Sequence, residues 1–451
     1  MNIGIVTTKY GQLQGIDQDG YTVFKGIPYA KPPVGDLRWK APQAPEAWEG
    51  VRYADQFGNR CFQGDRPPGD FYHKEFFADK TYVPPMSEDS LYLNIWTPAG
   101  SVGNKLPVAF WIHGGGFTGG FGTEREFDGD AFCQKGVILV TINYRLGALG
   151  FLAHSWLSQE NEKGLSGNYG ILDQVAALKW VYENISGFGG DPSNITVFGQ
   201  SAGSMSVQTL ISSQLTEGMI AKAILQSGGG YNSGLNQDRS LEEAKELGEE
   251  FVRLTGATSL AELKALTPEK IQEVSTIMSM EVLMSIEANK QSAISLPFTP
   301  IIDGYLLKDG YNTLVDQGRY HNIPYMIGSC QNDIGVTPEM IAKGERSQLY
   351  NGCVNWSLAG EKLGRKPSHV YYFSREMLGD DAGAFHSSEL WYIFGTLRRC
   401  WRPKEEADYC LSEKMVGYWT NFARNGDPNG PGLPEWKPCT STDPYVHELK
   451  G

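Results

Sequence analysis

The chain of 451 residues has no long hydrophobic run and no excess of positive charge. Its longest apolar segments, such as Val108–Ile112 and Val137–Val140, are far shorter than the roughly 20 residues that cross a bilayer. Lysine and arginine number 39 against 52 acidic residues, a net charge of −13, whereas binding to a nucleic-acid backbone depends on clustered basic charge. We therefore expect no membrane span, no nucleic-acid partner, and neutral or cationic ligands.

Cysteine is also scarce, with seven residues and no C-x-x-C pair. An odd number of unclustered cysteines argues against a dense disulfide framework and against a zinc ribbon. The first residues, MNIGIVTTKYGQ, show neither the basic start nor the apolar stretch of a secretory signal. We expect reduced, structural cysteines and a cytoplasmic location.

The chain is rich in short, β-branched apolar runs that alternate with helical patterns. Strands are expected at Val108–Ile112, Val137–Ile142, Ile195–Phe198, Ala223–Gln226, Ile323–Gly328 and Val370–Ser374. Continuous apolar runs are typical of parallel strands that are buried on both faces. Apolar residues at helical spacing over 171–185 predict a crossover helix between the second and third of these strands. The pattern predicts one α/β domain over residues 1–451, with a mostly parallel sheet and helices on both faces.

Two further stretches are purely helical. From Ser240 to about Asn289 the sequence carries helix-start signals at Ser240 and Ser259, each followed by glutamate three residues later. We expect a helical insertion at about residues 238–290. A last helix is expected near Glu405–Arg424, before the Asn-Gly stop.

A G-x-S-x-G sequence, Gly199–Gly203, directly follows the predicted strand Ile195–Phe198 and precedes a helix-compatible stretch. Such a turn doubles back tightly between small residues and leaves its serine exposed at the sheet edge. Ser201 is therefore the candidate nucleophile. The alternative is a simple glycine-rich turn.

A glycine-rich loop, His113–Phe117, follows another predicted strand. Acyl transfer to a serine places negative charge on the carbonyl oxygen, and glycine N–H groups approach that oxygen without obstruction. We expect Gly115, Gly116 and Ala202 to donate to this oxyanion. A simple glycine turn and a phosphate-binding loop are the alternatives, but the Gly-Lys-Ser/Thr ending of a phosphate loop is missing.

A catalytic serine needs a base, and the chain order for this turn is serine, acid, histidine. Four histidines follow Ser201: His321, His369, His386 and His447. His386 lies in the loop after the predicted strand 370–374, where the base is expected. His321 and His369 are expected at core or strand-end positions, and His447 in solvent.

The candidate acid is Asp333, which follows the predicted strand 323–328 by five residues. The alternatives for this position are a loop aspartate that caps a turn, or a different acid altogether. Glu339 lies six residues further on, and Asp303 precedes the strand, where a turn role is expected.

Several of these motifs are similar to those of the type-B carboxylesterase family, which includes cholinesterases and bacterial para-nitrobenzyl esterases. FGGDPSNITVFGQSAG (188–203) resembles its nucleophile pattern and SEDSLYLNIWTP (87–98) its second pattern. The chain is identified as a bacterial-type member. The resemblance implies an α/β-hydrolase fold with a helical excursion over the active site, a Ser201–His386–Asp333 triad and hydrolysis of small-molecule carboxylic esters. It also implies no cofactor and no metal.

The chain departs from the family pattern at three places. Gln200 stands where the family usually has glutamate, which removes a negative charge beside the site. Ser90 stands where the family has the cysteine that pairs with Cys61, so that disulfide cannot form. Asp333 stands where the family acid is usually glutamate, and its short separation from His386 implies trimmed helices over the pocket.

The substrate is not settled by the sequence. No tryptophan lies between Cys61 and Ser90, so the best stacking partner for a quaternary ammonium is missing. The aromatic residues of this loop, Phe71, Tyr72, Phe76, Phe77 and Tyr82, line an apolar or aromatic-acid pocket or else pack internally. A feruloyl or aryl esterase and a lipase stay open as alternatives, as does, more remotely, a catalytically silent recognition protein. The oligomeric state is not encoded in any recognisable pattern.

Overall fold

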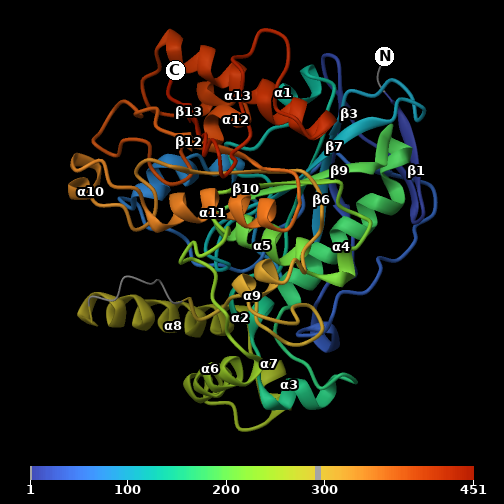
Figure 1. The fold of residues 1–451 in the computed structure, drawn as a ribbon. Helices are drawn as coiled ribbons and strands as arrows, with labels where there is room; N and C mark the ends of the chain where they lie inside the picture. The colour runs from blue at the N-terminus through green and yellow to red at the C-terminus, as the bar shows by residue number, and fades with distance from the viewer. Residues whose placement is uncertain (1–2, 290–295) are drawn as a thin grey trace.

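A mostly parallel sheet of 10 strands runs through the middle of the molecule in the computed structural model, which describes residues 3–289 and 296–451 (Figure 1). The strand order is β13-β12-β11-β10-β9-β7-β8-β6-β4-β3. The strands are β3 (Ile16–Asp17), β4 (Thr22–Pro28), β6 (Tyr92–Thr97), β7 (Leu106–Ile112), β8 (Ile138–Ile142), β9 (Gly190–Gln200), β10 (Lys222–Gln226), β11 (Tyr325–Cys330), β12 (His369–Phe373) and β13 (His447–Leu449). Strands β7 to β13 pair in parallel, whereas β3, β4 and β6 join antiparallel.

All six predicted strands are confirmed, with ends displaced by a few residues. Every residue of β8 and of β10 is buried. Burial on both faces is the reason that these strands read as continuous apolar runs. A separate three-stranded sheet, β1 (Ile5–Thr8), β2 (Gly11–Gln14) and β5 (Val51–Tyr53), lies at the N-terminal end.

Helices cover both faces of the main sheet (Figure 1). On one face lie α1 (Asp130–Gln134), α12 (Leu390–Ile393) and α13 (Glu406–Asn425), and on the other α4 (Tyr169–Asn184), α5 (Ala202–Ile211) and α11 (Gln348–Lys362). The predicted helices over 171–185 and 405–424 are thereby confirmed as α4 and α13. Shorter helices are α2 (Gly147–Phe151), α3 (Ser155–Glu160), α9 (Tyr311–Asp316) and α10 (Pro338–Ala342).

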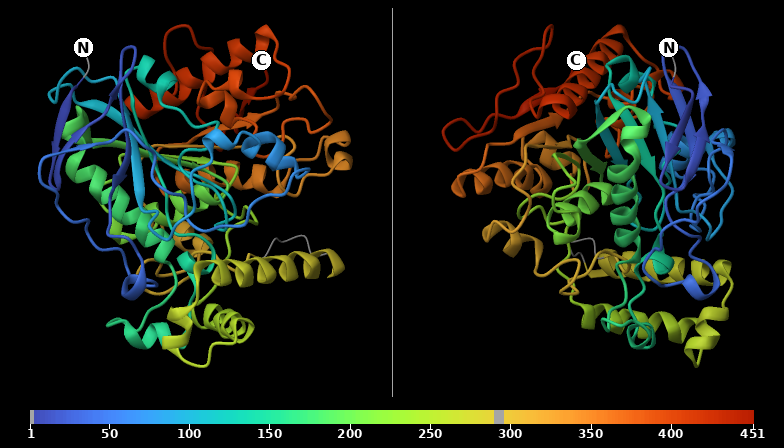
Figure 2. Two further views of the ribbon diagram at one scale, coloured as in Figure 1. Left: turned by 180° about the vertical axis from the view of Figure 1, so that it is seen from behind. Right: turned by 90° about the vertical axis from the view of Figure 1, so that its right-hand side faces the viewer.

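The helical segment after β10 forms a group of its own: α6 (Leu241–Thr255), α7 (Leu260–Ala265) and α8 (Pro268–Asn289). Ser240 and Glu243 form the expected reciprocal cap of α6, and Gly256 ends that helix in the left-handed region at φ 78°. Both views in Figure 2 place these helices below the sheet, with α8 extending outward. Residue 290, where the predicted insertion ends, lies outside the described residues.

His447 corrects one expectation. It is buried in β13 and stacks on Trp436 with ring centroids 4.8 Å apart. Burial and, to a smaller extent, the charge of the neighbouring His369 lower its pKa to about 4. The prediction of a solvated residue was wrong because the chain end pairs as an edge strand with β12. Within the described ranges, no helix is both long and apolar enough to cross a bilayer.

Candidate active site

Ser201 occupies the sharp turn between β9 and α5. Its backbone has φ 56° and ψ −125°, a conformation that L-residues rarely adopt. The turn is so tight that a Cβ on Gly199 would lie 2.6 Å from the Gly203 carbonyl carbon. A Cβ on Gly203 would lie 2.1 Å from the Ile112 oxygen. The small residues of the G-x-S-x-G pattern are thus required by the approach of β9, β7 and α5.

His386 and Asp333 meet at the carboxyl end of the sheet. The distance between His386 Nδ1 and Asp333 Oδ1 is 2.6 Å. Asp333 comes from the loop after β11 and His386 from the loop after β12, and these neighbouring loops are joined by a bridge between Asn332 and Phe385. Parallel strands end at the same edge of a sheet, so residues 53 positions apart become neighbours.

The Asp333 carboxylate is held by three more donors. The Ser227 hydroxyl (2.7 Å) and the Cys330 N–H (2.8 Å) donate to Oδ2, and the Ile334 N–H (2.8 Å) donates to Oδ1. Burial alone raises the pKa of Asp333, but the charge of His386 and these hydrogen bonds outweigh burial, so the pKa lies below its ordinary value. The carboxylate therefore stays ionised in a buried place.

The pKa of the His386 imidazole is also shifted by its contact with Asp333. Burial lowers the pKa of His386, but the adjacent Asp333 carboxylate and its hydrogen bond raise the pKa above the ordinary value. A further contribution in that direction comes from Glu389, a fully buried carboxyl whose own pKa is raised by burial. An imidazole with a stabilised cation is suited to take up a proton.

The other ring nitrogen of His386 faces Gln200. The Gln200 Nε2 lies 3.1 Å from His386 Nε2. When Nδ1 donates to Asp333, Nε2 accepts a hydrogen bond from the Gln200 amide. Among the described residues no hydrogen bond joins Ser201 to His386, an arrangement common before substrate tightens a site.

Three backbone N–H groups are free beside Ser201. The N–H groups of Gly115, Gly116 and Ala202 make no hydrogen bond with any described residue, and all three residues line the same cavity as Ser201. Gly115 has φ 101° and Gly116 φ 62°, and both angles favour glycine. This arrangement offers unobstructed donors to an oxygen bound over Ser201.

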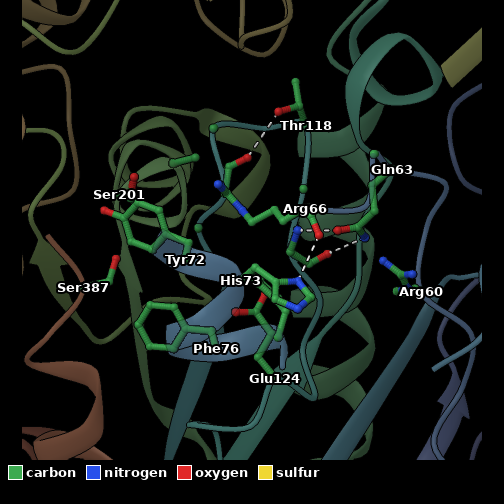
Figure 3. A pocket seen from close by; sticks show the side chains of 18 of the residues that line it. Arg60, Gln63, Arg66, Tyr72, His73, Phe76, Thr118, Glu124, Ser201 and Ser387 are labelled. Atoms are coloured by element: carbon green, nitrogen blue, oxygen red, sulfur yellow. Dashed lines mark hydrogen bonds between the residues drawn. The ribbon is translucent and has the colours of Figure 1, made fainter. Parts of the chain in front are cut away.

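A cavity of about 520 Å³ opens over these groups, and Ser201 and His386 are part of its wall. Figure 3 shows Ser201 beside Tyr72 in this cavity. Of the five aromatic residues named above in the segment between Cys61 and Ser90, Tyr72, Phe76 and Phe77 line the cavity. Phe71 instead packs edge-on against Phe385 at 4.9 Å, and Tyr82 lies under Arg399. The aromatic loop therefore supplies both pocket wall and packing.

The alternative acids are placed elsewhere. Glu339 is exposed and pairs with Lys343 at 2.6 Å. Asp303 accepts hydrogen bonds from the backbone of Tyr305 and Leu306, which is the expected turn role. Neither lines the cavity, and the same holds for His321 and His369.

Several residues of the site gave no signal in the sequence. Ser227 holds Asp333, Glu389 lies behind the His386–Asp333 pair, and Gln63 forms two hydrogen bonds with the backbone of Gly120 in the glycine loop. They belong to loops whose neighbours are set only by the fold. In the part of the chain that the structure describes, no group of His, Cys, Asp or Glu is placed to hold a metal ion.

Comparison with known proteins identifies the family of the chain. The model of the carboxylesterase family matches residues 3–351 and 353–450. A para-nitrobenzyl esterase of Bacillus subtilis is 34% identical over 94% of this chain and 90% of its own length. A fumonisin B1 esterase of Sphingopyxis macrogoltabida is 40% identical over 71% of this chain, and the alignment spans 54% of that protein.

Solved structures are similar over nearly the whole chain. A thermophilic para-nitrobenzyl esterase superposes with a TM-score of 0.84 at 31% identity, covering 99% of this chain and 96% of the other. A Geobacillus stearothermophilus carboxylesterase gives a TM-score of 0.80 at 32% identity, with coverage of 99% and 96%. These matches confirm the α/β-hydrolase fold and the resemblance found in the sequence. The chain therefore belongs to the type-B carboxylesterase family as a bacterial-type member, and it is a carboxylic ester hydrolase.

Proposed function

We propose that the chain hydrolyses small-molecule carboxylic esters through an acyl-enzyme formed on Ser201. The observation that carries this proposal is the 2.6 Å contact between Asp333 and His386, because His386 lines the same cavity as Ser201. His386 takes the proton of Ser201 as its oxygen attacks the ester carbonyl, and Asp333 stabilises the resulting imidazolium.

Both halves of the reaction use the same groups. The N–H groups of Gly115, Gly116 and Ala202 hold the negative oxygen of each tetrahedral intermediate. His386 passes its proton to the departing alcohol, then activates the water that releases the acyl group. For this, the imidazole Nε2 has to exchange its contact with Gln200 for one with Ser201.

The test is replacement of the nucleophile. Ser201→Ala should lower ester hydrolysis by several powers of ten, because the oxyanion donors remain while the attacking oxygen is gone; a residual acceleration of about 10³ over water is typical. A fluorophosphonate probe should label the parent and not the variant. Parent-level turnover by a folded Ser201→Ala protein would end this proposal, whereas a parent that neither hydrolyses esters nor takes up the probe would favour the silent recognition protein.

The substrate class is supported by the cavity wall. Tyr72, Phe76 and Phe77 offer apolar and aromatic surface near Ser201, which favours esters with an apolar or aromatic group. The relatives named for para-nitrobenzyl and fumonisin B1 esters support small-molecule esters as the class. An aryl esterase is the second candidate, on the strength of these three rings.

We also propose that the protein works in a reducing compartment such as the cytoplasm, and that its helical insertion belongs to a single domain. All seven cysteines are free, and Cys61 lies beside Ser90 rather than a second cysteine. A secreted enzyme of this size would gain stability from a disulfide at this place. Cell fractionation tests the location.

A further inference from the structure

Three basic side chains line the cavity. Arg60, Arg66 and Lys80 all contribute to its wall. Figure 3 shows Ser201 on one side of the cavity, Arg60 on the other and Arg66 between them. This grouping contrasts with the net charge of −13 of the whole chain.

Arg66 lies over Tyr72, another residue of the cavity wall. Its guanidinium lies over the Tyr72 ring, 5.0 Å from the centroid, and the Tyr72 hydroxyl donates to the His386 carbonyl oxygen at 3.3 Å. The carboxylate of Asp70 is 3.3 Å from Arg66 Nη1, a long and partly exposed pair with the arginine side chain 42% exposed. Such a pair is weak, so the guanidinium is available to a ligand.

Arg60 is held in a fixed orientation. Its side chain is only 8% exposed, and Nε donates to the Pro84 carbonyl oxygen at 3.0 Å while Nη2 pairs with Asp65 at 2.8 Å. No described residue accepts a hydrogen bond from Nη1. A buried, pre-oriented guanidinium with a free N–H is a strong binding element for an anionic group.

The acidic residues of the same wall, Asp65, Glu124 and Glu126, offset these charges only in part, because Asp65 engages only Nη2 of Arg60. Burial raises the pKa of Glu124 to about 7 and raises that of Glu126 well above its ordinary value, and the two carboxyls are hydrogen-bonded to each other. Two buried carboxyls in contact hold a proton between them and carry less than two charges. Within the described residues, Lys80 has no carboxylate at ion-pair distance.

We propose that Arg66 and Arg60 bind a free carboxylate on the ester substrate, so that the preferred substrates are esters that retain an ionised carboxyl group, such as half-esters of dicarboxylic acids. This inference rests on the proposed function. The planar guanidinium matches the two oxygens of a carboxylate, and Tyr72 and Phe76 offer apolar surface to a methylene spacer between the carboxylate and the ester.

The experiment compares the monoethyl and diethyl esters of succinate, glutarate and adipate at neutral pH. The parent should hydrolyse the half-ester with the higher kcat/KM at one or more chain lengths. Arg66→Gln should lower kcat/KM for that half-ester by about 10–100-fold, the value of one charge-assisted hydrogen bond. The kcat/KM of Arg66→Gln for the diethyl ester should stay within about twofold of the parent value, because this ester has no carboxylate for the arginine to bind.

Two further variants test the specificity of the effect. Lys74→Gln removes the same charge from the same segment, but Lys74 lies over the Trp401 ring, at 3.3 Å, and does not line the cavity. It should leave both esters unchanged. Arg66→Lys retains the charge without the planar fork and should give an intermediate loss.

A last pair of substrates locates the carboxylate. Monoethyl succinate carries it on the acyl side, whereas 3-acetoxypropanoate carries it on the alcohol side, and the Arg66-dependent substrate identifies the side that is bound. Equal losses for charged and uncharged esters, or no effect of Arg66→Gln on any charged ester, would overturn the carboxylate site. Absence of diester hydrolysis together with absence of fluorophosphonate labelling would instead contradict the esterase function itself.

Discussion

Asp333 accepts four hydrogen bonds, from His386, Ser227, Cys330 and Ile334. These contacts place one carboxylate oxygen against the imidazole and anchor the other to the end of β11. The shorter aspartate side chain reaches His386 because the two loops pair through Asn332. Substitution of Asp333 should therefore act directly on the orientation and the charge of His386.

The first prediction concerns the acid. Asp333→Asn should lower kcat by about 10³–10⁴, because the imidazolium loses its orienting charge. Glu339→Gln and Asp303→Asn, which alter an exposed ion pair and a turn, should stay within about tenfold of the parent. Measuring the three variants side by side with one ester decides the assignment. A nearly active Asp333→Asn variant beside an inactive Glu339→Gln variant would show that the acid is Glu339.

The second prediction concerns pH. His386 has a pKa above its ordinary value and must be neutral to act as base, so kcat/KM should rise with pH as the imidazolium loses its proton. Gln200→Glu places a carboxylate next to Nε2, which stabilises the imidazolium and raises the pKa of His386 further. The acidic limb of kcat/KM should therefore move to higher pH.

Gln200→Ala is the control for this shift, because it removes the amide without adding charge. Its acidic limb should move upward less than that of Gln200→Glu, because it loses only the amide that donates to the neutral imidazole. An acidic limb of Gln200→Glu at or below that of the parent would show that residue 200 does not act on the base.

The parent should also use acetylcholine less efficiently than an uncharged ester of similar size, because neither a carboxylate at residue 200 nor a loop tryptophan offsets desolvation of the ammonium.

At the scale of elements, the glycine loop after β7 depends on left-handed backbone. A Cβ on Gly115 would lie 2.1 Å from the Gly119 oxygen, whereas a Cβ on Gly116 would meet nothing closer than 3.9 Å. The obstacle at Gly115 is therefore contact, and at Gly116 it is the φ of 62°. A side chain at either Gly115 or Gly116 would therefore reorient the peptide N–H groups that face the cavity.

The third prediction follows from this loop. Gly116→Val should lower kcat by about 10²–10³, the usual effect of losing one oxyanion donor. Gly35→Ala is a matched control, because Gly35 also has a left-handed φ, of 56°, with open space around it and no place in the cavity wall. It should retain full activity in the same assay. Normal turnover by folded Gly116→Val would remove the loop from the site.

At the scale of the whole molecule, a buried ion pair ties the segment after β8 to α4. Arg145 donates to both oxygens of Asp173, at 2.7 and 2.8 Å, and the two side chains are 3% and 0% exposed. A buried arginine without its carboxylate is strongly destabilising, because the charge has lost both water and partner.

The fourth prediction is therefore about stability. Asp173→Asn should lower the free energy of unfolding by about 3–5 kcal/mol, read from the midpoint of urea denaturation. Glu183→Gln removes a carboxylate from the same helix, but its pair with Lys9 is at the surface, with the lysine 57% exposed. It should change the free energy of unfolding by less than about 1 kcal/mol. Equal effects of the two variants would contradict the importance of burial.

The strands, the two major helices and the family were predictable from the amino-acid sequence. These features are local: a run such as Val137–Ile142 is apolar because both faces are covered, and the turn around Ser201 needs small residues within five positions. The roles of Ser201, His386 and Asp333 stay predictions, but their shared location was foreseeable, since each follows a strand of one parallel sheet.

Contacts between residues far apart in the chain could be found only from the three-dimensional structure. Burial of His447 depends on its pairing with β12, and the contact of Gln200 with His386 joins the ends of two separate strands. The net charge of −13 favoured neutral or cationic ligands, yet Arg60 and Arg66 meet in the wall of one cavity. Composition averages charge over the whole surface, whereas a ligand senses only the groups within a few ångströms, because water and salt screen the others.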